Sequence, residues 1–487
     1  MPMTCQKTLL SILLVFFLLF VSSETKADFF WNFIPKAKIE KLTNKYVFLN
    51  SDSKIYAPKE FKTHYNLIFQ EITNLLERIK NDKKSAQIFI KIVPIGYNNF
   101  LSLKNLEGYS IIINDQKIEI FSPSLRGLLY GLTYLESLIL KNQGEIPIGE
   151  IHNWPDLKIR ALHLAGKATK AQIEEWIKKA RFAHFNTLVI RIGKPIFRKK
   201  VWKKFKKNSD KLTLNWFFKL KEIITLDDFK EIINYAKENG LEIIPQIDFL
   251  THQKTFIADI YPEFMFNIFT YDPRKDKLYT TVIFPFIDEL ISVIHPKAIH
   301  IGHDEVAGWN KWFLKKFNVK MLPSSLFLKD IVKLYDYLNK KGINVWMWGD
   351  MLLSPEECSF EIRKSCHGVE DYPKLRKLLP KDIVICDWHY FDEKKDFPSS
   401  FAFIKEGYRV IGVTWFKENT IKNFTKYIAN LPYNNLGMMA TTWKGALRKK
   451  IKQKGIKDNQ KIKLIANQII DEIIKKSGNI FWNTSNN

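Results

Sequence analysis

Two adjacent carboxylates, Asp304 and Glu305, closely follow the short apolar run Ala298–Gly302, with His303 between. A run of this length is typical of a buried strand, which places both acids at a strand end and not on a solvated face. Burying two adjacent carboxylates costs free energy unless charged partners or pKa shifts compensate, and function is the usual reason for keeping such a pair. The pair therefore indicates acid–base chemistry.

Further residues that could take part in chemistry follow other apolar runs of the chain. They combine tryptophans with carboxylates, histidines and an arginine: Arg160, His163, Asp248, His252, Trp348, Asp350, Trp388, Tyr390, Trp415 and Trp443. An indole face packs against the C–H face of a sugar ring, while carboxylates bind hydroxyls and transfer protons. Carboxylates flanked by tryptophans therefore favour a sugar substrate, although inward-facing tryptophans can also simply fill a core.

The elements that must position these residues alternate strand and helix from residue 158 onward. Helical stretches such as Lys170–His184 and Leu226–Asn239 separate eight apolar runs, and Thr225 with Asp228 forms a capping box before the second helix. The eight expected strands are Ile159–Leu164, Thr187–Ile192, Leu241–Ile247, Ala298–Gly302, Ile343–Trp348, Ile383–Cys386, Arg409–Trp415 and Gly437–Trp443. Eight such units predict a (β/α)8 TIM barrel, whose functional residues gather at the C-terminal ends of the strands. A doubly wound open sheet is the alternative, but no G-x-G-x-x-G motif follows the first run.

The region before the barrel has a different pattern. Tyr109–Ile113 and Lys117–Phe121 predict a hairpin, and Leu125–Leu140 predicts a helix. The fold class is thus α/β, a TIM barrel preceded by a small α+β domain. The expected units are a signal peptide (1–27), an N-terminal α+β accessory domain (28–150), the barrel catalytic domain (151–450) and a C-terminal helical segment packing on the barrel (451–487).

The first 27 residues have the features of a secretory signal peptide. Lys7 precedes the apolar run Leu9–Val21, which is shorter than the roughly 20 residues that span a bilayer, and Ala27 supplies a small residue for cleavage. We expect an exported protein, periplasmic or secreted, with no membrane span in the mature chain; an uncleaved anchor is the alternative.

The charge balance is strongly basic, with 76 Lys+Arg against 51 Asp+Glu and a formal net charge of +25. Either an anionic partner or a lysine-rich solvated surface explains this excess. Lysines are scattered through nearly every segment and no nucleic-acid motif accompanies them, so we expect no nucleic-acid partner. One stretch, Lys194–Lys207, is denser, and because it follows the second strand it is expected to rise beside the pocket mouth.

The cysteines indicate neither a disulfide framework nor a zinc site. Cys5 lies in the signal peptide, and Cys358, Cys366 and Cys386 remain. One Cys358–Cys366 bridge and three buried thiols are both compatible with this spacing. We expect no metal and no cofactor, and the sequence does not indicate an oligomeric state.

Several motifs resemble one family of enzymes. The run Ala298–Val306, AIHIGHDEV, is similar to the signature of family 20 glycoside hydrolases, the β-N-acetylhexosaminidases. Other segments resemble further parts of that family, in the same order along the chain: Leu106–Tyr109 with Gly127–Gly131, Trp154–Arg160, and Leu241–Asp248 with His252. Trp348-Gly-Asp-Met351 looks closer to divergent members.

The resemblance implies an exo-acting β-N-acetylhexosaminidase that removes terminal β-linked N-acetylhexosamine by substrate-assisted, retaining catalysis. In this mechanism the acetamido oxygen of the substrate is the nucleophile and an oxazoline is the intermediate. It further implies that Glu305 is the acid and base and that Asp304 orients the acetamido group. His252, with Asp248 nearby, would support the acid. The residues implied to bind the sugar are Arg160, Trp348, Asp350, Trp388, Tyr390, Trp415 and Trp443.

The sequence also departs from the family pattern. Ala165 stands where an Asp is usual, Arg191 and Lys194 stand where His and Asp are usual, Gln246 replaces a Glu, and Lys444 follows the last tryptophan where an acid soon follows in relatives. The contacts to the sugar hydroxyls O3, O4 and O6, and the choice between GlcNAc and GalNAc, are therefore open.

Two other functions remain compatible with the sequence. One is a two-carboxylate retaining glycosidase with Glu305 as acid/base and Glu418 as nucleophile, which requires the two carboxyls to lie about 5–5.5 Å apart. The other is a non-catalytic sugar-binding protein on the same barrel.

Overall fold

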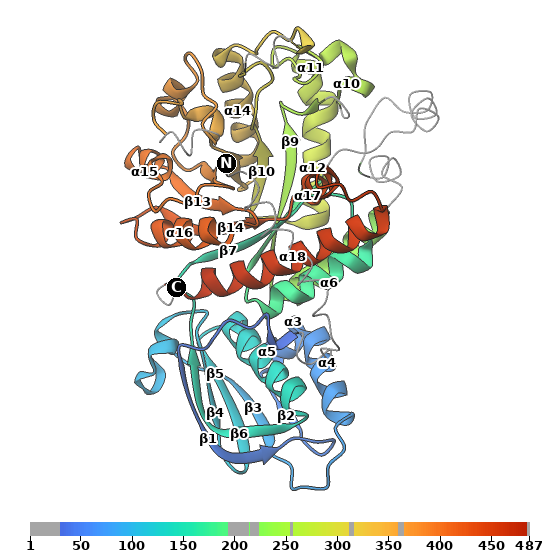
Figure 1. The fold of residues 1–487 in the computed structure, drawn as a ribbon, viewed down its shortest axis with the longest axis vertical. Coiled ribbons are helices and arrows are strands. Elements are labelled where there is room, and N and C mark those ends of the chain that lie inside the picture. The colour runs from blue at the N-terminus through green and yellow to red at the C-terminus, as the bar shows by residue number, and fades with distance from the viewer. Residues whose placement is uncertain are drawn as a thin grey trace, which may run out of the picture.

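The structure is a computed structural model that describes residues 30–192, 214, 224–253, 257–310, 316–358 and 365–484. Figure 1 shows two parts, an N-terminal sheet domain and a larger barrel, with the last long helix running between them. In the described residues we find no helix that is both long and apolar enough to cross a membrane.

The N-terminal domain is one six-stranded sheet with the order β1-β6-β4-β5-β3-β2. The predicted hairpin is present, because β4 pairs antiparallel with β5, and the long helix α5 packs on β4 and β5. Alternating residues of these strands are buried under α4 and α5, which gives the domain its own apolar core. The elements are β1 (Ile39–Phe48), β2 (Ile55–Tyr56), α3 (Lys59–His64), α4 (Asn66–Glu77), β3 (Gln87–Ile92), β4 (Tyr109–Ile113), β5 (Lys117–Ser122), α5 (Leu125–Asn142) and β6 (Glu145–Asn153).

Eight parallel strands close into a barrel in the order β10-β11-β12-β13-β14-β7-β8-β9. The closing pair is β14 with β7, which join residues far apart in the sequence, so the predicted TIM barrel is confirmed and the open-sheet alternative is wrong. The strands are β7 (Ile159–Leu164), β8 (Thr187–Arg191), β9 (Glu242–Phe249), β10 (Ala298–Gly302), β11 (Asn344–Trp348), β12 (Val384–Trp388), β13 (Arg409–Thr414) and β14 (Asn435–Thr441).

Helices surround the barrel and carry the chain between strands. The capping box predicted from Thr225 and Asp228 is present at the start of α9. The described helices are α6 (Lys170–Phe182), α9 (Leu226–Glu238), α10 (Ile257–Ile260), α11 (Asp276–Leu278), α12 (Phe284–Ile294), α14 (Ser324–Asn339), α15 (Pro398–Lys405), α16 (Glu418–Ala429), α17 (Lys444–Gln453) and α18 (Asn459–Trp482). The last strand of the first domain ends at Asn153, the first barrel strand begins at Ile159, and α17 begins at Lys444.

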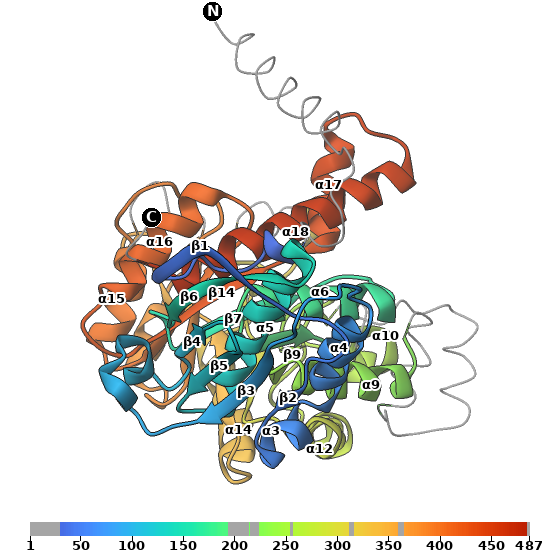
Figure 2. The same cartoon turned by 90° about the horizontal axis from the view of Figure 1, so that it is seen from below.

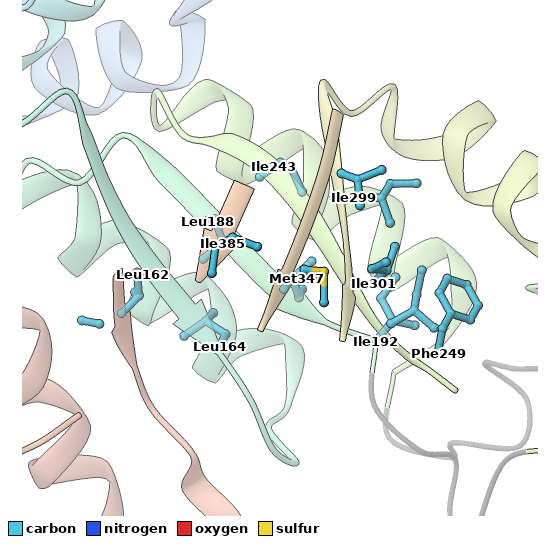
Figure 3. Close-up of a cluster of buried hydrophobic side chains, with 14 of the residues drawn as sticks. Leu162, Leu164, Leu188, Ile192, Ile243, Phe249, Ile299, Ile301, Met347 and Ile385 are labelled. Carbon is cyan, nitrogen blue, oxygen red and sulfur yellow. The ribbon is translucent and has the colours of Figure 1, made fainter. Parts of the chain in front are cut away.

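Side chains alternate between the two faces of each barrel strand. On β7, Ala161 belongs to the cluster inside the barrel, whereas Leu162 and Leu164 pack outward against the helices. Figure 3 shows this outer layer, in which Leu188, Ile243, Ile299 and Ile385 from other strands join them. Because successive side chains of a strand point to opposite faces, only every second residue at a strand end reaches the mouth of the barrel.

Candidate active site

A pocket of about 280 Å³ lies at the C-terminal ends of the barrel strands. This volume is near the lower end of ligand pockets, which span about 300–1,000 Å³, and suits a single sugar ring better than a long chain. The pocket is lined by Arg191, His252, Asp304, Glu305, Trp348, Trp388, Tyr390, Trp415, Trp443 and Ala446. Eight residues proposed from the sequence therefore come together here, while Arg160, Asp248 and Asp350 are not among the lining residues.

The backbone that presents the two carboxylates is unusually bent. Gly302, His303 and Glu305 have φ values of 79°, 72° and 47°, in the left-handed region that side-chain-bearing residues rarely adopt. At Gly302 an added Cβ would lie 3.1 Å from Asp248 Cα, a tight contact that adds to the preference for glycine. Strain of this kind persists only where surrounding contacts fix the conformation.

His303 supplies one of those fixing contacts. Its Nδ1 donates to the carbonyl oxygen of Ile301 at 3.0 Å, and its Nε2 lies 2.8 Å from Oδ2 of Asp330 on α14. Asp330 is fully buried and also accepts hydrogen bonds from the hydroxyls of Tyr271 and Tyr279. The residue just before Asp304 is thereby anchored in the layer between barrel and helices.

Asp350 supplies the second fixing contact, and this corrects its predicted role in binding sugar. The side chain is buried beneath the pocket, and its Oδ2 accepts the backbone N–H of Glu305 at 3.0 Å and Nδ1 of His367 at 2.9 Å. The ring of His367 stacks on Trp309 with centroids 3.8 Å apart. Asp350 therefore holds the backbone of Glu305 instead of facing the substrate.

The two adjacent carboxylates have opposite electrostatic surroundings. Nε2 of His252 lies 3.3 Å from Oδ2 of Asp304 and 4.0 Å from Oε2 of Glu305. Burial would raise the pKa of Asp304, but the charge and hydrogen bond of His252 outweigh it and hold that pKa below its ordinary value. Enclosure by the protein and then the Asp304 charge raise the pKa of Glu305. The surroundings thus favour the ionised form of Asp304 and the protonated form of Glu305, the pattern that separates an acid from a charge stabiliser.

His252 carries the proton that produces this difference. Burial alone would lower its pKa, but the Asp304 carboxylate raises the pKa to about 9. The prediction that His252 supports the acid is thus refined, because its hydrogen bond is to Asp304. Below the pocket, burial lowers the pKa values of His163 and His300 to about 3, so these rings bring no charge into the barrel.

His252, Asp304 and Glu305 also have the residue types and proximity of a metal site, since their ligand atoms lie within 4.8 Å of one another. A histidine must be neutral to bind a metal. Because Asp304 keeps His252 protonated at neutral pH, a cation would have to displace that proton. The donor set therefore fits acid–base chemistry better than metal binding.

Arg160 is not where the sequence-based interpretation put it. It lies near the start of β7 and faces outward, opposite to Ala161, and its guanidinium bonds Glu107 of the N-terminal domain at 2.5 Å. The same guanidinium donates to the carbonyl oxygens of Leu157 and His184. The assignment of Arg160 to sugar binding is corrected, because the fully buried side chain joins the two domains.

Arg191, at the end of β8, is the arginine that reaches the pocket. Its Nε and Nη2 bond the carboxylate of Asp248, and its guanidinium carbon lies 5.2 Å from the ring centroid of Trp443. Asp248 therefore orients Arg191, and its charge adds to that of Asp304 in raising the pKa of His252. In the sequence, Arg191 was noted only as a departure from the family pattern. Its position on the inward face of β8 is the signal that could have identified it as a pocket residue.

The aromatic walls are fixed by hydrogen bonds of their own. Trp443 Nε1 donates to the hydroxyl oxygen of Tyr390 at 2.9 Å, and Trp415 Nε1 donates to the carbonyl of Thr442. Trp388 stacks on Tyr390 with centroids 4.9 Å apart. Because the Tyr390 oxygen already accepts a hydrogen bond, its own O–H is available to donate to a ligand.

Three remaining expectations concern residues outside the pocket. Glu418 begins α16 and pairs with Lys422 and Lys476, so the structure removes it as a nucleophile opposite Glu305. Cys358 and Cys366 form a disulfide, while Cys386 is a buried free thiol. The basic stretch Lys194–Lys207 lies outside the described residues.

A closed barrel that presents two adjacent carboxylates in an aromatic pocket is typical of the glycoside hydrolases that are built on a barrel. Within that class the chain belongs to glycosyl hydrolase family 20, whose catalytic domain matches residues 194–444, just over half of the 487 residues. The resemblance inferred from the sequence motifs is confirmed.

Individual relatives are distant. A lacto-N-biosidase of Bifidobacterium bifidum is 24% identical over 328 residues, which cover 63% of this chain and 26% of that protein. A β-hexosaminidase subunit B1 of Dictyostelium discoideum is 23% identical over 419 residues, covering 77% and 70%. The solved β-N-acetylhexosaminidase of Bacteroides fragilis has a TM-score of 0.63 at 18% identity, covering 91% of this chain and 90% of that one. At these identities the structural likeness is one of fold, and the chain spans only about a quarter of the first relative.

Proposed function

We propose that this protein is an exo-acting β-N-acetylhexosaminidase that uses the acetamido group of its substrate as the nucleophile. The observation that carries the proposal is Oδ1 of Asp304, a buried carboxylate oxygen at the pocket that has no hydrogen-bond partner among the described residues. An acceptor left unpaired in a buried site costs about 1–3 kcal/mol, so its partner is expected to come from a ligand. An acetamido N–H supplies such a donor, and the neighbouring Tyr390 hydroxyl can donate to the acetamido oxygen.

The reaction then follows from the two pKa directions. Protonated Glu305 gives its proton to the glycosidic oxygen as the C1–O bond breaks, and the acetamido oxygen forms the new bond to C1. Ionised Asp304 accepts the acetamido N–H and stabilises the positive charge that spreads over the resulting oxazolinium ring. Glu305, now ionised, removes a proton from water, whose oxygen attacks C1. The bond between C1 and the acetamido oxygen breaks, which restores the acetamido group and gives net retention. Aromatic walls and Arg191 hold the ring in place.

Two variants test these roles separately. Glu305→Gln should lose at least about 100-fold in kcat on substrates with poor leaving groups and far less on activated aryl glycosides, because only a poor leaving group needs the proton. Asp304→Asn should lower kcat on both substrate types by about 100-fold or more and bind a thiazoline mimic of the intermediate much more weakly than the wild type.

Glu418→Gln is the matched control, since it removes the acid that the two-carboxylate mechanism would use. Wild-type activity is expected for this variant. If Glu418→Gln were inactive, or if Asp304→Asn bound the thiazoline as tightly as the wild type, substrate-assisted catalysis would be the wrong mechanism.

Export remains a proposal from the sequence, because residues 1–29 lie outside the described residues. A disulfide in the barrel domain supports an oxidising compartment. Sequencing the N-terminus of the protein recovered from outside the cytoplasm tests it, and an N-terminus ahead of Leu9 would contradict cleavage after Ala27.

A further inference from the structure

A strongly basic helical hairpin begins at the wall of the pocket. It consists of α17, the connection after it and the first turn of α18, and we call residues 444–463 the basic hairpin. Figure 2 shows α17 and this connection standing away from the rest of the molecule. The segment holds nine basic residues, Lys444, Arg448, Lys449, Lys450, Lys452, Lys454, Lys457, Lys461 and Lys463, against the single acid Asp458. The whole chain, with 76 basic and 51 acidic residues, is far more balanced.

The charges of the basic hairpin are not neutralised within the protein. In the described part of the chain, none of its basic side chains forms an ion pair, and those of Lys449, Lys452, Lys454 and Lys457 are exposed. Asp458 is engaged elsewhere, since its side chain accepts the backbone N–H of Gln460 as the N-cap of α18. Unpaired like charges repel one another, so a binding partner of opposite charge would be stabilised here.

Lys444 is the buried lysine of the basic hairpin, and its pKa is affected by the neighbouring basic residues. Lys444 lies against Trp176 and Gln172. Burial, and then the charges of Lys463 and Arg448, lower the pKa of Lys444 to about 8. Burial is the larger cause, and the charges of the two basic neighbours in the hairpin act in the same direction.

The basic hairpin is continuous with the sugar pocket. Ala446 in its first turn lines the pocket, and Trp443 just before it forms part of the same wall. The ammonium of Lys450 lies 4.8 Å from the ring centroid of Phe391 and 5.8 Å from that of Trp415, which lines the pocket as well. Phe391 is 41% exposed. The side chains of Trp415, Phe391 and Lys450 therefore connect the pocket with the exposed lysines of the basic hairpin.

We infer that the basic hairpin docks an acidic glycan, whose carboxylate or sulfate groups belong to the part of the substrate that remains outside the pocket. The inference rests on the proposed function and narrows its substrate to N-acetylhexosamine linked to an acidic chain. The basic hairpin is continuous with an aromatic pocket that fits a sugar ring. This favours a glycan as the partner, because a nucleic acid or an anionic membrane could bind the lysines without using the pocket. At physiological salt the lysines act over about 8 Å, so the docked chain must lie directly on the hairpin.

The test compares two quadruple variants of the full mature protein. One replaces Lys449, Lys452, Lys454 and Lys457 with Ser, and the matched control replaces four exposed lysines of the N-terminal domain, Lys54, Lys59, Lys80 and Lys84, with Ser. Each removes four positive charges and leaves the pocket residues unchanged. Values of kcat/KM are measured across a salt series with chitotriose as the neutral substrate and with a hyaluronan oligosaccharide that carries N-acetylglucosamine at its non-reducing end.

We expect the hairpin variant to lose about tenfold in kcat/KM on the acidic oligosaccharide at low salt, with a flatter salt dependence. Its kcat/KM on chitotriose, and both values for the control variant, should stay within about twofold of the wild type. Equal losses in the two variants, or no loss in the hairpin variant, would overturn the docking role.

A binding measurement keeps this inference separate from the proposed function. A hyaluronan oligosaccharide with a uronate at its non-reducing end is titrated into wild type and variants by calorimetry, which requires no turnover. Weaker binding only in the hairpin variant supports docking even if no substrate is hydrolysed, in which case the proposed function alone fails. Unchanged binding of the oligosaccharide, with loss of binding to duplex DNA or to phosphatidylglycerol vesicles, would assign the surface to those partners and refute the glycan.

Discussion

Replacing Asp350 and His367 tests whether these residues hold the backbone of Glu305, the proposed catalytic acid. Asp350 is fully buried and receives the Glu305 N–H at 3.0 Å, His367 Nδ1 at 2.9 Å and Trp388 Nε1 at 3.4 Å. In Asp350→Asn the amide keeps the shape but places an NH2 group where an oxygen accepted donors. A hydrogen bond to a charged group contributes about 1.5–3 kcal/mol, and about 1.4 kcal/mol corresponds to tenfold. We therefore expect kcat to fall about 10- to 100-fold, with KM changed by less than about threefold.

The pH profile distinguishes this positioning role from general loss of packing. The charge of Asp350 raises the pKa of Glu305, whereas His367 lowers it. Because Glu305 must be protonated to act as the acid, activity falls on the alkaline side as pH passes its pKa. Asp350→Asn should move this alkaline limb to lower pH, and His367→Gln should move it to higher pH.

The assay is kcat and kcat/KM against pH on an aryl N-acetylhexosaminide, with thermal melts in parallel. Glu136→Gln is the control, since Glu136 is a buried carboxylate paired with Arg181 on the side of the N-terminal domain. It should lower Tm without moving the pH profile. Shifts of Asp350→Asn and His367→Gln in the same direction, or no shift in either, would refute the reasoning.

Two further predictions concern buried charges away from the pocket. Arg160→Met should lower the stability by about 3 kcal/mol, because Glu107 keeps only Arg126 as a cationic partner among the described residues and the buried carbonyls of Leu157 and His184 lose their donor. The variant should leave KM unchanged for the folded protein, and a raised KM would support a role of Arg160 in sugar binding. Burial opposes a charge on His389, but Asp387 raises its pKa to about 9, above the value of about 6.5 in an unfolded chain. Protonated His389 therefore adds at most about 3 kcal/mol to the free energy of unfolding. This contribution is complete below about pH 6.5 and is lost as pH rises through about 9. Thermal melts across this window should fall more steeply for the wild type than for His389→Gln, and parallel curves would contradict the assignment.

The barrel itself was predictable because each strand is a short apolar run and each helix has its own start signal. Boundaries of β7 and β10 agree with the expected residues, and the Thr225 capping box marks the start of α9. The adjacent acids were also visible, because a polar pair directly after a buried strand has few purely structural explanations. Local pattern thus located the fold and two of the residues that line the pocket.

The supporting residues were harder to predict because their role depends on the face they occupy. Arg160 and Arg191 both lie on barrel strands, but only Arg191 is in the inward register, and one position along a strand reverses the face. Asp330 gave a usable signal, since it stands among the buried residues Phe327, Ile331 and Leu334 on one side of α14. His367 gave none, because it reaches Asp350 through a connection that follows no periodic pattern.

The arrangement explains how two neighbouring carboxylates perform opposite tasks. Adjacent acids in one pocket would normally share a proton and titrate together. Here the bent backbone turns Asp304 towards His252, whose proton stabilises its charge, and turns Glu305 towards the open pocket, where 45% of the side chain is exposed. Asp330 holds the bend through His303, and Asp350 holds it through the Glu305 N–H. The strained backbone is therefore part of the chemistry, because relaxing it would let the two carboxyls face the same surroundings and would remove the difference in pKa between them.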